Sequence, residues 1–508
     1  MAADAEIELK FLIAENDSAK IKALVSAAAG SNQPSHQRLR ALYFDTPNGD
    51  LWKHGFTLRV RSNGTSHVQT VKQLTSSSVD RGEWEAETAG PEPDLGLLKN
   101  TPLARLAAKS SIRQALRAAF EVNVERTVYL ITARGGVIEA SLDRGAIEAH
   151  GEKLGVRELE LELKSGEHHH LFNLARSFVA QAPLHPSLIS KAERGHLFAR
   201  GSWGRPTKSS KPRLNREMTC EQAFQQIGQA CLRDFHLNML GLEKLKNAEA
   251  IHQGRVAVRR LRAAMTLFKP MVFDIAYRRL RGELQWLARM LGAARDRDVL
   301  RANLLERATG DDEACAQASE LASLFEAERL RARQAAVEAL DSERGRILLL
   351  DLALWIEDGR WKRQPSGITK EPIQSFTGLR LRKRHKKLIR LGAYLAHLAP
   401  GPRHKVRIEA KELRYMADFF ADCPGIVRDH KSLKKLIDCC EKMQSALGVI
   451  RDEEAIAEFM EREVWGHAAA DTEAKPASSE ASRSKADTKR ELKKAVRAYS
   501  KLAEIDAF

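Results

Sequence analysis

The sequence predicts a multidomain protein: an N-terminal antiparallel β-barrel with an internal tunnel and flanking helices, followed by an all-α domain built as a duplicated helical bundle. The chain has 508 residues, which is too long for one hydrophobic core. Short runs of alternating polar and apolar residues dominate residues 1–165, whereas long amphipathic stretches dominate after residue 217. Within those stretches, two motifs occur twice at the same spacing.

Strands are expected in the N-terminal domain where such alternation is bounded by turn signals. They are expected at residues 6–11, 57–61, 66–71, 83–87, 122–132 and 157–164. Helices are expected at residues 18–29, 101–119 and 171–180. We therefore place the first domain at residues 1–200.

The remaining boundaries follow from composition. Residues 201–216 are rich in Gly, Pro, Ser and Lys, which is typical of an interdomain linker. The helical domain is expected at residues 217–465, with repeats at about 217–364 and 372–465. Residues 466–508 are expected to be a low-complexity tail, mobile at 467–488, with a terminal helix at 489–503.

Charge and cysteine usage limit the function classes. The net charge of +16 implies an anionic partner: nucleic acid, a membrane surface or phosphates. No run of 18 apolar residues occurs and the chain begins with acidic residues, so neither a membrane span nor a signal peptide is expected. The six cysteines form no CxxC pair, which favours a reducing compartment over disulfides or a zinc site. We expect a cytoplasmic protein without a membrane partner.

Charged side chains share one face of several predicted strands. Glu6, Glu8 and Lys10 are two residues apart, so in a strand all three side chains face the same way. The same spacing occurs for Arg59 and Arg61, for Glu83, Glu85 and Glu87, and for Glu158, Glu160 and Glu162. A single strand of this kind normally turns its charges to water and its apolar side to the core.

Several such strands together favour a different arrangement. Closing them into a barrel whose apolar side is covered by helices would place the charges inside. Buried ions are costly unless they pair with each other or hold ligands. Acidic strands that bind a divalent cation and basic strands that bind phosphate would satisfy both signs. The pattern therefore predicts a polar tunnel for a metal–polyphosphate complex.

A series of short motifs includes these strands in a fixed order. It consists of ExExK at residues 6–10, YFDTPNGDLWKHGFTLRVR, VQTVK, RGEWE, ERT, SLDRG, ELELELK and SKAERG. This series, over about residues 4–200, resembles the CYTH superfamily of triphosphate tunnel metalloenzymes. That superfamily contains inorganic triphosphatases, thiamine triphosphatases, RNA triphosphatases and class IV adenylate cyclases.

The resemblance implies roles for individual residues. Metal binding is implied for Glu6, Glu8, Asp143, Glu160 and Glu162, with Glu158 as an alternative in the last strand. Phosphate binding is implied for Lys10, Arg59, Arg61, Lys72, Arg126 and Lys191, and the catalytic set is Glu6, Glu8, Lys10, Arg59 and Arg61. Glu83 or Glu85 also belongs to the tunnel, and the sequence leaves open which of the two faces inward. We interpret His168, His169 and His170 as an exposed loop rather than a metal site.

The implied activity is hydrolysis of inorganic triphosphate to pyrophosphate and phosphate with Mg²⁺ or Mn²⁺. Phosphoryl transfer mostly requires positioning and charge neutralisation, so no side-chain nucleophile is needed. Two cations would bridge phosphate oxygens and activate a water molecule. The sequence has no GxxxxGK[ST] motif, which argues against a P-loop nucleotidase.

The duplicated motifs of the helical part contain basic stripes. His252-x-x-Arg255-Val-x-x-Arg259-x-Leu261-Arg262 matches His404-x-x-Arg407-Ile-x-x-Lys411-x-Leu413-Arg414, and Leu291-Gly292-x-x-Arg295-Asp296 matches Leu447-Gly448-x-x-Arg451-Asp452. At 100° per residue, the four basic positions of each helix lie within an arc of about 80°. Because like charges at this spacing repel, their recurrence favours polyanion binding over a merely solvated face.

This repeat resembles the CHAD domain over about residues 217–465. The resemblance implies binding of inorganic polyphosphate by His252, Arg255, Arg259, Arg262, His404, Arg407, Lys411 and Arg414. We expect Arg295–Asp296 and Arg451–Asp452 to pair internally and to orient the stripes. Association with cytoplasmic polyphosphate granules is left open.

Other functions remain open at this point. The protein is alternatively a non-catalytic polyphosphate-binding or localising protein, or a tunnel enzyme that acts on thiamine triphosphate or nucleoside triphosphates, or as an adenylate cyclase. Nucleic-acid binding is disfavoured because the basic stripes contain no aromatic platform. The oligomeric state is not predicted.

Overall fold

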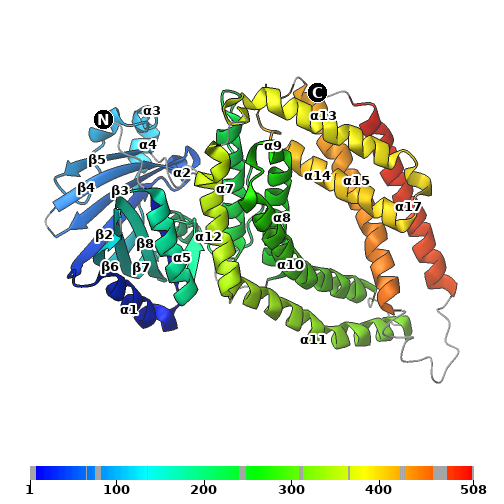
Figure 1. Ribbon diagram of the computed structural model, residues 1–508, viewed down its shortest axis with the longest axis horizontal. Coiled ribbons are helices and arrows are strands. Elements are labelled where there is room, and N and C mark those ends of the chain that lie inside the picture. Colours follow the sequence, from blue (N-terminus) through cyan, green and yellow to red (C-terminus); the bar gives the residue numbers. More distant parts are fainter. Residues whose placement is uncertain are drawn as a thin grey trace.

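The structure is a computed structural model that describes residues 7–505, except 65, 75–81, 134, 240–246, 308–312, 364–366, 424, 426, 428 and 461–477. A part that contains the sheet and a part that contains the long helices lie side by side (Figure 1). All the described strands precede residue 188 and the long helices follow, which confirms the predicted fold class of each part.

The nine described strands form one antiparallel sheet. They are β1 (Glu8–Ile13), β2 (Ser35–Asp45), β3 (Phe56–Asn63), β4 (Ser66–Gln73), β5 (Glu83–Thr88), β6 (Arg117–Ala133), β7 (Gly136–Ala149), β8 (Glu152–Ser165) and β9 (Leu184–Ser187). Their order in the sheet is β5-β4-β3-β2-β6-β7-β8-β1-β9. The edges are β5 and β9, so the described strands curve into a tunnel-like sheet without closing a ring of hydrogen bonds.

Every strand predicted from alternation is present, but β2, β7 and β9 were not predicted. The predicted helix at 101–119 is wrong over part of its length. In its place the structure has two short helices, α3 (Ala104–Ala107) and α4 (Ser110–Ala115), and the strand β6 begins at Arg117. This alanine-rich start of β6 pairs with the end of β2, so strand pairing overrides its helical preference.

The sheet turns an apolar face outward and a charged face inward. In β8, Leu159 and Leu161 are completely buried in a core shared with the covering helices α1 (Ser18–Ala29) and α5 (His168–Gln181). Glu158 and Glu160 alternate with these leucines and therefore lie on the opposite face. The predicted inversion, in which helices cover the apolar side, is confirmed for this strand.

The helical part consists of two successive groups of helices. The first contains α7 (Cys220–Met239), α8 (Ala248–Leu267), α9 (Lys269–Val272), α10 (Ile275–Arg307), α11 (Glu313–Asp341) and α12 (Glu343–Asp358). The second contains α13 (Ile373–Gly392), α14 (Pro400–Asp418), α15 (His430–Met460) and α17 (Ser478–Ala503). No helix among the described residues is long and apolar enough to cross a membrane.

The duplicated motifs occupy equivalent helices. The basic stripes lie on α8 and α14, and the Leu-Gly motifs lie on α10 and α15. In each group the stripe helix packs against the Leu-Gly helix, and α8 also contacts α14. The two repeats therefore meet at their basic helices.

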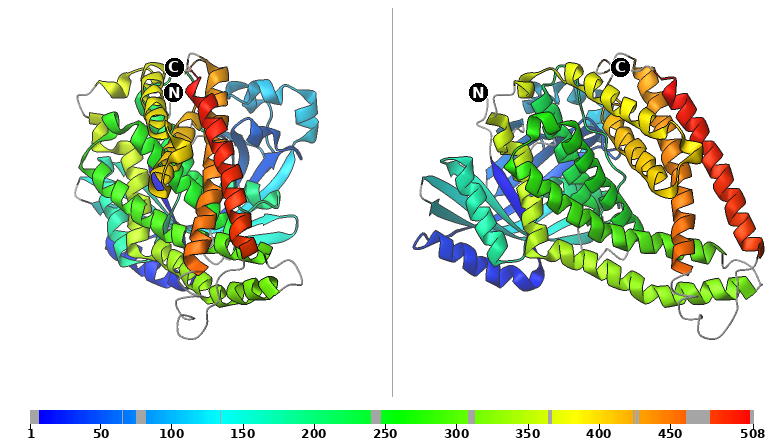
Figure 2. Two further views of the ribbon diagram at one scale, coloured as in Figure 1. Left: turned by 90° about the vertical axis from the view of Figure 1, so that its right-hand side faces the viewer. Right: turned by 45° about the vertical axis from the view of Figure 1, so that its right-hand side comes forward.

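The terminal helix is longer than predicted. It starts at Ser478 instead of residue 489 and lies along α15 in both views of Figure 2. Ala495, Ala498 and Leu502 of α17 are buried in the helical core. The part of the predicted mobile stretch at 467–477 lies outside the described residues. The terminal helix thus belongs to the helical domain.

The segment at residues 201–216 connects the two parts but packs along α7. Asp234 accepts hydrogen bonds from the backbone N–H of Ser210 (2.9 Å) and from its hydroxyl (2.7 Å). Arg260 donates to the Ser210 carbonyl at 2.8 Å. Thr207 and Asn238 exchange two further bonds of 2.9 Å. These bonds fix the connection to the helical domain.

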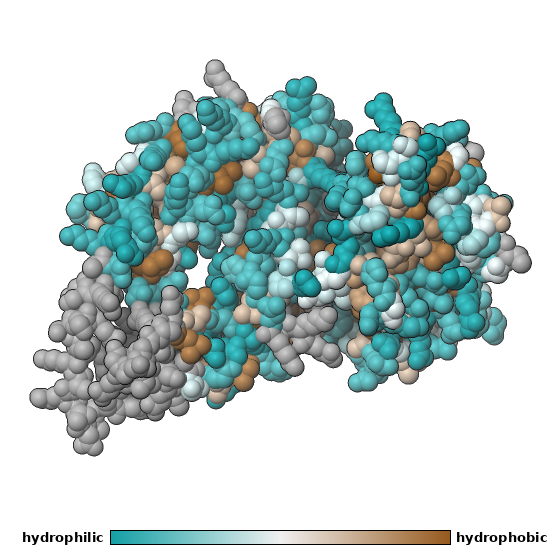
Figure 3. Space-filling model, turned by 180° about the vertical axis from the view of Figure 1, so that it is seen from behind, coloured by the Kyte–Doolittle hydropathy of each residue, from teal (hydrophilic) through white to brown (hydrophobic). Residues whose placement is uncertain are grey.

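Helix α12 joins the two parts through apolar and ionic contacts. Leu350 is 1% exposed and lies in the core of the sheet domain rather than in the helical core. Next to it, the carboxylate of Asp351 forms ion pairs with Arg176 of α5 and with Arg279 of α10, the latter with an N···O distance of 2.7 Å. His185 of β9 lies 3.1 Å from Asp341. The face seen in Figure 3 is mainly hydrophilic, with scattered hydrophobic residues.

We expect Leu350→Ala to lower the free energy of unfolding by about 2–4 kcal/mol, because it leaves a cavity in a shared core. Leu379→Ala is the matched control, since Leu379 is 66% exposed, and its effect should stay within about 0.5 kcal/mol. Urea titration followed by circular dichroism measures both. Equal effects of the two variants would contradict the assignment of Leu350 to the domain interface.

Candidate active site

The inward face of the sheet surrounds a cavity of about 640 Å³. Strands β1 to β8 contribute to its wall, together with α6 (Lys191–Ala199). Eight basic side chains line it: Lys10, Arg59, Arg61, Lys72, Arg126, Lys164, Lys191 and Arg233. Eight acidic side chains also line it: Glu8, Glu83, Glu85, Glu139, Asp143, Glu160, Glu162 and Glu193. The wall therefore contains equal numbers of positive and negative groups.

The structure brings the predicted tunnel residues together, with one exception that it does not describe. Glu8, Lys10, Arg59, Arg61, Lys72, Arg126, Asp143, Glu160, Glu162 and Lys191 all line the cavity. Glu6 lies outside the described residues. Both Glu83 and Glu85 line the cavity, so the open choice between them is resolved in favour of both. Glu158 is 1% exposed and lies deeper, against Arg194.

Three carboxylates form a compact cluster at one side of the cavity. Asp143 of β7 and Glu158 and Glu160 of β8 each offer an oxygen atom, and these oxygens lie within 4.8 Å of one another. Hard divalent cations prefer such oxygen ligands. These donors therefore fit the cation that the sequence predicts, and Glu8 lies close enough to Glu160 to affect its charge.

The ammonium group of Lys191 touches the same three carboxylates. Its Nζ lies 2.7 Å from Asp143 and 2.8 Å from Glu160, and it also contacts Glu158. Lys191 is the first residue of α6, and Ser190 caps this helix by accepting the Glu193 N–H at 3.2 Å. The capped N-terminus of α6 thus places one positive charge among the acidic groups.

Arg126 adds a second positive charge to the cluster. Its Nε and Nη2 each donate to Asp143 at 2.7 Å, and Nη2 also donates to Glu160 at 2.5 Å. Burial alone would lower the pKa of Arg126, but these carboxylates raise it above its usual value. The Arg126 guanidinium is therefore permanently charged.

Two groups of the cluster titrate near neutral pH. Burial, followed by the charge of Glu8, raises the pKa of Glu160 to about 7. Burial lowers the pKa of Lys191 to about 7, although Asp143 opposes this shift. Active sites commonly contain such shifted groups.

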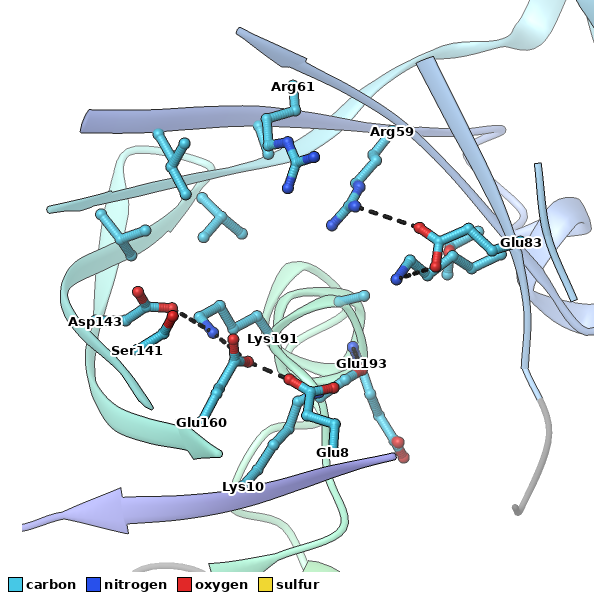
Figure 4. A pocket seen from close by; sticks show the side chains of 18 of the residues that line it. Glu8, Lys10, Arg59, Arg61, Glu83, Ser141, Asp143, Glu160, Lys191 and Glu193 are labelled. Carbon is cyan, nitrogen blue, oxygen red and sulfur yellow. Dashed lines mark hydrogen bonds and ion pairs between the residues drawn. The ribbon is translucent and has the colours of Figure 1, made fainter. Parts of the chain in front are cut away.

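The opposite side of the cavity is basic, as Figure 4 shows for Arg59 and Arg61. Arg59 lies 3.6 Å from Glu83 and 3.7 Å from Glu85, and its buried Nε has no hydrogen-bond partner. Burial and the neighbouring guanidinium of Arg59 lower the pKa of Arg61. A buried donor without a partner and a repelled guanidinium both favour an anionic ligand between them.

The histidine run lies at the start of a helix that covers the sheet. His168, His169 and His170 form the first turn of α5 rather than a loop, so that part of the prediction is wrong. His168 lies 3.6 Å from Asp358, and His169 lies 3.1 Å from Glu167. Among the described residues, the carboxylates of Asp143, Glu158 and Glu160 are the ones grouped closely enough to share a cation.

The basic stripes of the helical part face each other. Burial, followed by the charges of Arg259, Arg407 and Arg255, lowers the pKa of Lys411 to about 7. Arg259 and Arg255 belong to α8, whereas Arg407 and Lys411 belong to α14. Burial and Arg255 likewise lower the pKa of Arg259 to about 10. Positive groups from both repeats are therefore gathered in one place without enough opposite charge.

The Leu-Gly motifs hold the stripe arginines. A Cβ atom on Gly292 would lie 3.6 Å from the Arg255 guanidinium, and one on Gly448 would lie 3.5 Å from that of Arg407. Arg255 also donates to Asp296 at 2.5 Å. Asp296 therefore contacts the stripe through Arg255, and Arg451 of the second repeat lies 3.6 Å from Glu454. The predicted pairing within Arg295–Asp296 and Arg451–Asp452 stays a prediction.

The two parts of the chain match two known domain families. Residues 4–196 match the model of the CYTH domain, and residues 226–461 match the model of the CHAD domain. The chain therefore consists of a CYTH domain followed by a CHAD domain.

Individual relatives resemble one domain each. An inorganic triphosphatase of Haemophilus influenzae is 31% identical over 162 residues, which are 31% of this chain and 44% of that protein. The CHAD domain of the plant Ricinus communis is 25% identical with a TM-score of 0.47, over 59% of this chain and 98% of that one. A Hippeastrum protein described as an adenylyl cyclase with dominant triphosphatase activity is 21% identical with a TM-score of 0.29, over 39% and 96%. The match thus spans less than half of the Haemophilus protein.

Sequence reasoning missed several lining residues. Glu139 lies on β7 two positions before Ser141 and four before Asp143, so a strand prediction there would have placed all three on one face. Arg233 comes from α7 of the CHAD domain and has no local signal, because only the docking of two domains brings it to the cavity.

We expect the affinity for Mn²⁺ to rise about tenfold between pH 6 and pH 8. The pKa of Glu160 is raised to about 7, so this group is neutral below that pH and becomes a carboxylate ligand above it. Calorimetric titration of the whole chain with Mn²⁺ at both pH values measures the effect. Glu160→Gln is the control and should reduce the pH dependence to the part that comes from Lys191, whose pKa is also about 7. A pH-independent wild-type affinity would contradict the assignment.

Proposed function

We propose that the CYTH domain hydrolyses inorganic triphosphate to pyrophosphate and phosphate with Mg²⁺ or Mn²⁺. The observation that supports this most is one cavity with an acidic cluster on one side and converging guanidinium groups on the other. Because the wall holds eight groups of each sign, it favours a polyanion that enters with its own cations. A metal–triphosphate complex has this charge distribution.

The acidic residues would bind the cation, and the basic residues would bind the phosphate oxygens. When bound at Asp143, Glu158 and Glu160, a divalent cation would polarise phosphoryl oxygens and lower the pKa of a bound water. Arg59, Arg61 and Lys10 would bind the equatorial oxygens, where charge changes in the transition state. The attacking group is water, since phosphoryl transfer needs no protein nucleophile.

The wall favours an unsubstituted phosphate chain over a nucleotide. Among the described lining residues, the one aromatic side chain is that of Tyr43. Its ring is already stacked on Phe120, with centroids 4.6 Å apart. On this described wall a nucleobase would therefore find at most the one ring of Tyr43 to stack on. Turnover of thiamine triphosphate or ATP, or cyclic nucleotide formation, remains an outcome that the assay can show.

We expect Arg59→Ala to lower kcat/KM for inorganic triphosphate at least about 100-fold, because a buried guanidinium no longer neutralises the phosphates. Arg38→Ala is the control, since this side chain is 78% exposed and should leave the rate unchanged. Phosphate release is measured with inorganic triphosphate, ATP, thiamine triphosphate and long-chain polyphosphate, with and without EDTA. Wild-type rates in Arg59→Ala, or full activity in EDTA, would reject the proposal.

For the CHAD domain we propose binding of inorganic polyphosphate between the two basic stripes. The clustered charges of Arg259, Arg407 and Lys411 repel one another, so the free protein maintains an unfavourable arrangement. Arg407 and Arg262 also have buried Nε atoms without hydrogen-bond partners. A linear polyanion between α8 and α14 would relieve this repulsion and supply acceptors.

We expect Lys411→Met to weaken polyphosphate binding about tenfold and to raise the melting temperature of the free protein. Folding lowers the pKa of Lys411 from 10.5 to about 7. As the pH falls between these values, the unfolded chain binds a proton at Lys411 more readily than the folded protein, so Lys411 increasingly destabilises the fold. The stabilisation should therefore be larger at pH 6.5 than at pH 9.5.

Fluorescence titration with long-chain polyphosphate and with duplex DNA at matched salt measures the binding. Lys442→Ala is the control, because Lys442 is 64% exposed on α15 and pairs with Asp438. Lower stability of Lys411→Met together with unchanged affinity would reject the site. Tighter binding of DNA than of polyphosphate would favour a nucleic-acid partner instead.

A further inference from the structure

The CHAD domain reaches the cavity of the CYTH domain through α7. Helix α7 packs on α12, which itself docks on α5 and β9 of the CYTH domain. At the closest approach, a Cβ atom on Gly228 would lie only 2.9 Å from Ile356 of α12, so glycine permits the contact. Gln225 donates to the Glu357 carbonyl at 2.9 Å, and Gln229 contacts the Glu357 side chain. The position of α7 relative to the tunnel is therefore fixed.

One face of α7 continues from α12 to the tunnel. Gln225, Gln229 and Arg233 are four residues apart, so they form a row on this face. The first two bind α12, and Arg233 extends beyond it to Glu193 of α6. The guanidinium of Arg233 lines the same cavity as the predicted phosphate-binding groups. A charged group of the second domain thus forms part of the wall of the first.

The surroundings of Arg233 are suited to an anion. Its partner Glu193 belongs to the first turn of α6, next to Ser190 and Lys191, which also line the cavity. The N-terminus of a helix attracts anions through its free N–H groups. The side chain of Arg233 is 31% exposed, whereas that of Glu193 is 9% exposed. The side chain of Arg233 is therefore open to the cavity, while its partner Glu193 is buried.

We propose that Arg233 is a phosphate-binding residue of the tunnel, supplied by the CHAD domain, and that Glu193 pairs with its guanidinium only until an anion replaces it. This inference rests on the proposed function, that the tunnel binds inorganic triphosphate. Guanidinium groups bind phosphate through paired donors, and Arg233 can turn such donors from Glu193 to the substrate. The CHAD domain then completes the triphosphate site instead of only anchoring the protein to polyphosphate.

The simpler explanation is that Arg233 and Glu193 only brace the interface. The two explanations differ in the sign of one effect. If the pair is a brace, loss of either partner should harm the protein similarly. If Arg233 binds substrate, loss of Glu193 leaves the guanidinium free for the anion and strengthens binding.

The experiment compares full-length variants in the triphosphate assay, with KM, kcat and melting temperature measured for each. Arg233→Gln is expected to raise KM about tenfold with kcat changed less than about threefold. Glu193→Gln is expected to lower KM or leave it unchanged. Arg176→Gln removes another ionic contact of the interface, to Asp351, away from the cavity, and should leave KM unchanged.

The outcomes separate the two proposals. No turnover of triphosphate by the wild-type chain would reject the proposed function. Turnover with the wild-type KM in Arg233→Gln, or equal increases in KM for Arg233→Gln and Glu193→Gln, would reject the role of Arg233. Should Arg233→Gln fail to fold, Arg233→Lys replaces it. The lysine keeps the charge but not the paired donors. Its KM should therefore be about threefold above that of wild type, below the tenfold increase expected for complete loss of the guanidinium.

Discussion

The sheet domain depends on the pairing of opposite charges inside a curved sheet. Lys191 and Arg126 lie among Asp143, Glu158 and Glu160, so that each buried ion has a partner. Burial of isolated ions would cost far more than the apolar core outside the sheet returns. The outer face of the sheet is buried against α1 and α5 through apolar contacts, and the ion pairs offset the cost of burying charges on its inner face. Fold and site are therefore consequences of the same alternation.

The helical domain handles charge in the opposite way. Its facing stripes contain Arg259, Arg407 and Lys411 with little compensating charge, and the pKa of Lys411 falls as a result. Gly292 and Gly448 allow guanidinium groups to lie against α10 and α15, where the helices hold them. The tunnel wall, with equal numbers of acidic and basic groups, suits an anion that binds together with its cations. The basic stripes suit an anion that releases its cations on binding. If both domains bind phosphate chains as proposed, the CYTH domain suits a chain that carries its cations, and the CHAD domain suits a chain that has released them.

Local pattern predicted the parts of the site that lie on clearly alternating strands. The charges of β1, β3 and β8 were placed on one face because a strand repeats every two residues. The strand β7 was missed, since Asp143, Arg144 and Gly145 resemble a turn, and only its long neighbours β6 and β8 hold it extended. Helical spacing likewise located both stripes on α8 and α14. The contribution of Arg233 arises from domain docking, which no local pattern encodes.

The contact between α8 and α14 has a consequence for the origin of the helical domain. Each half of the duplication supplies one of the two facing basic helices, and neither half has the other. An ancestor with a single copy would have needed a symmetric homodimer to form the same surface. Fusion of the copies would have replaced a concentration-dependent association with an intramolecular one. It would also have freed the halves to diverge, as Arg259 and Lys411 now do at equivalent positions.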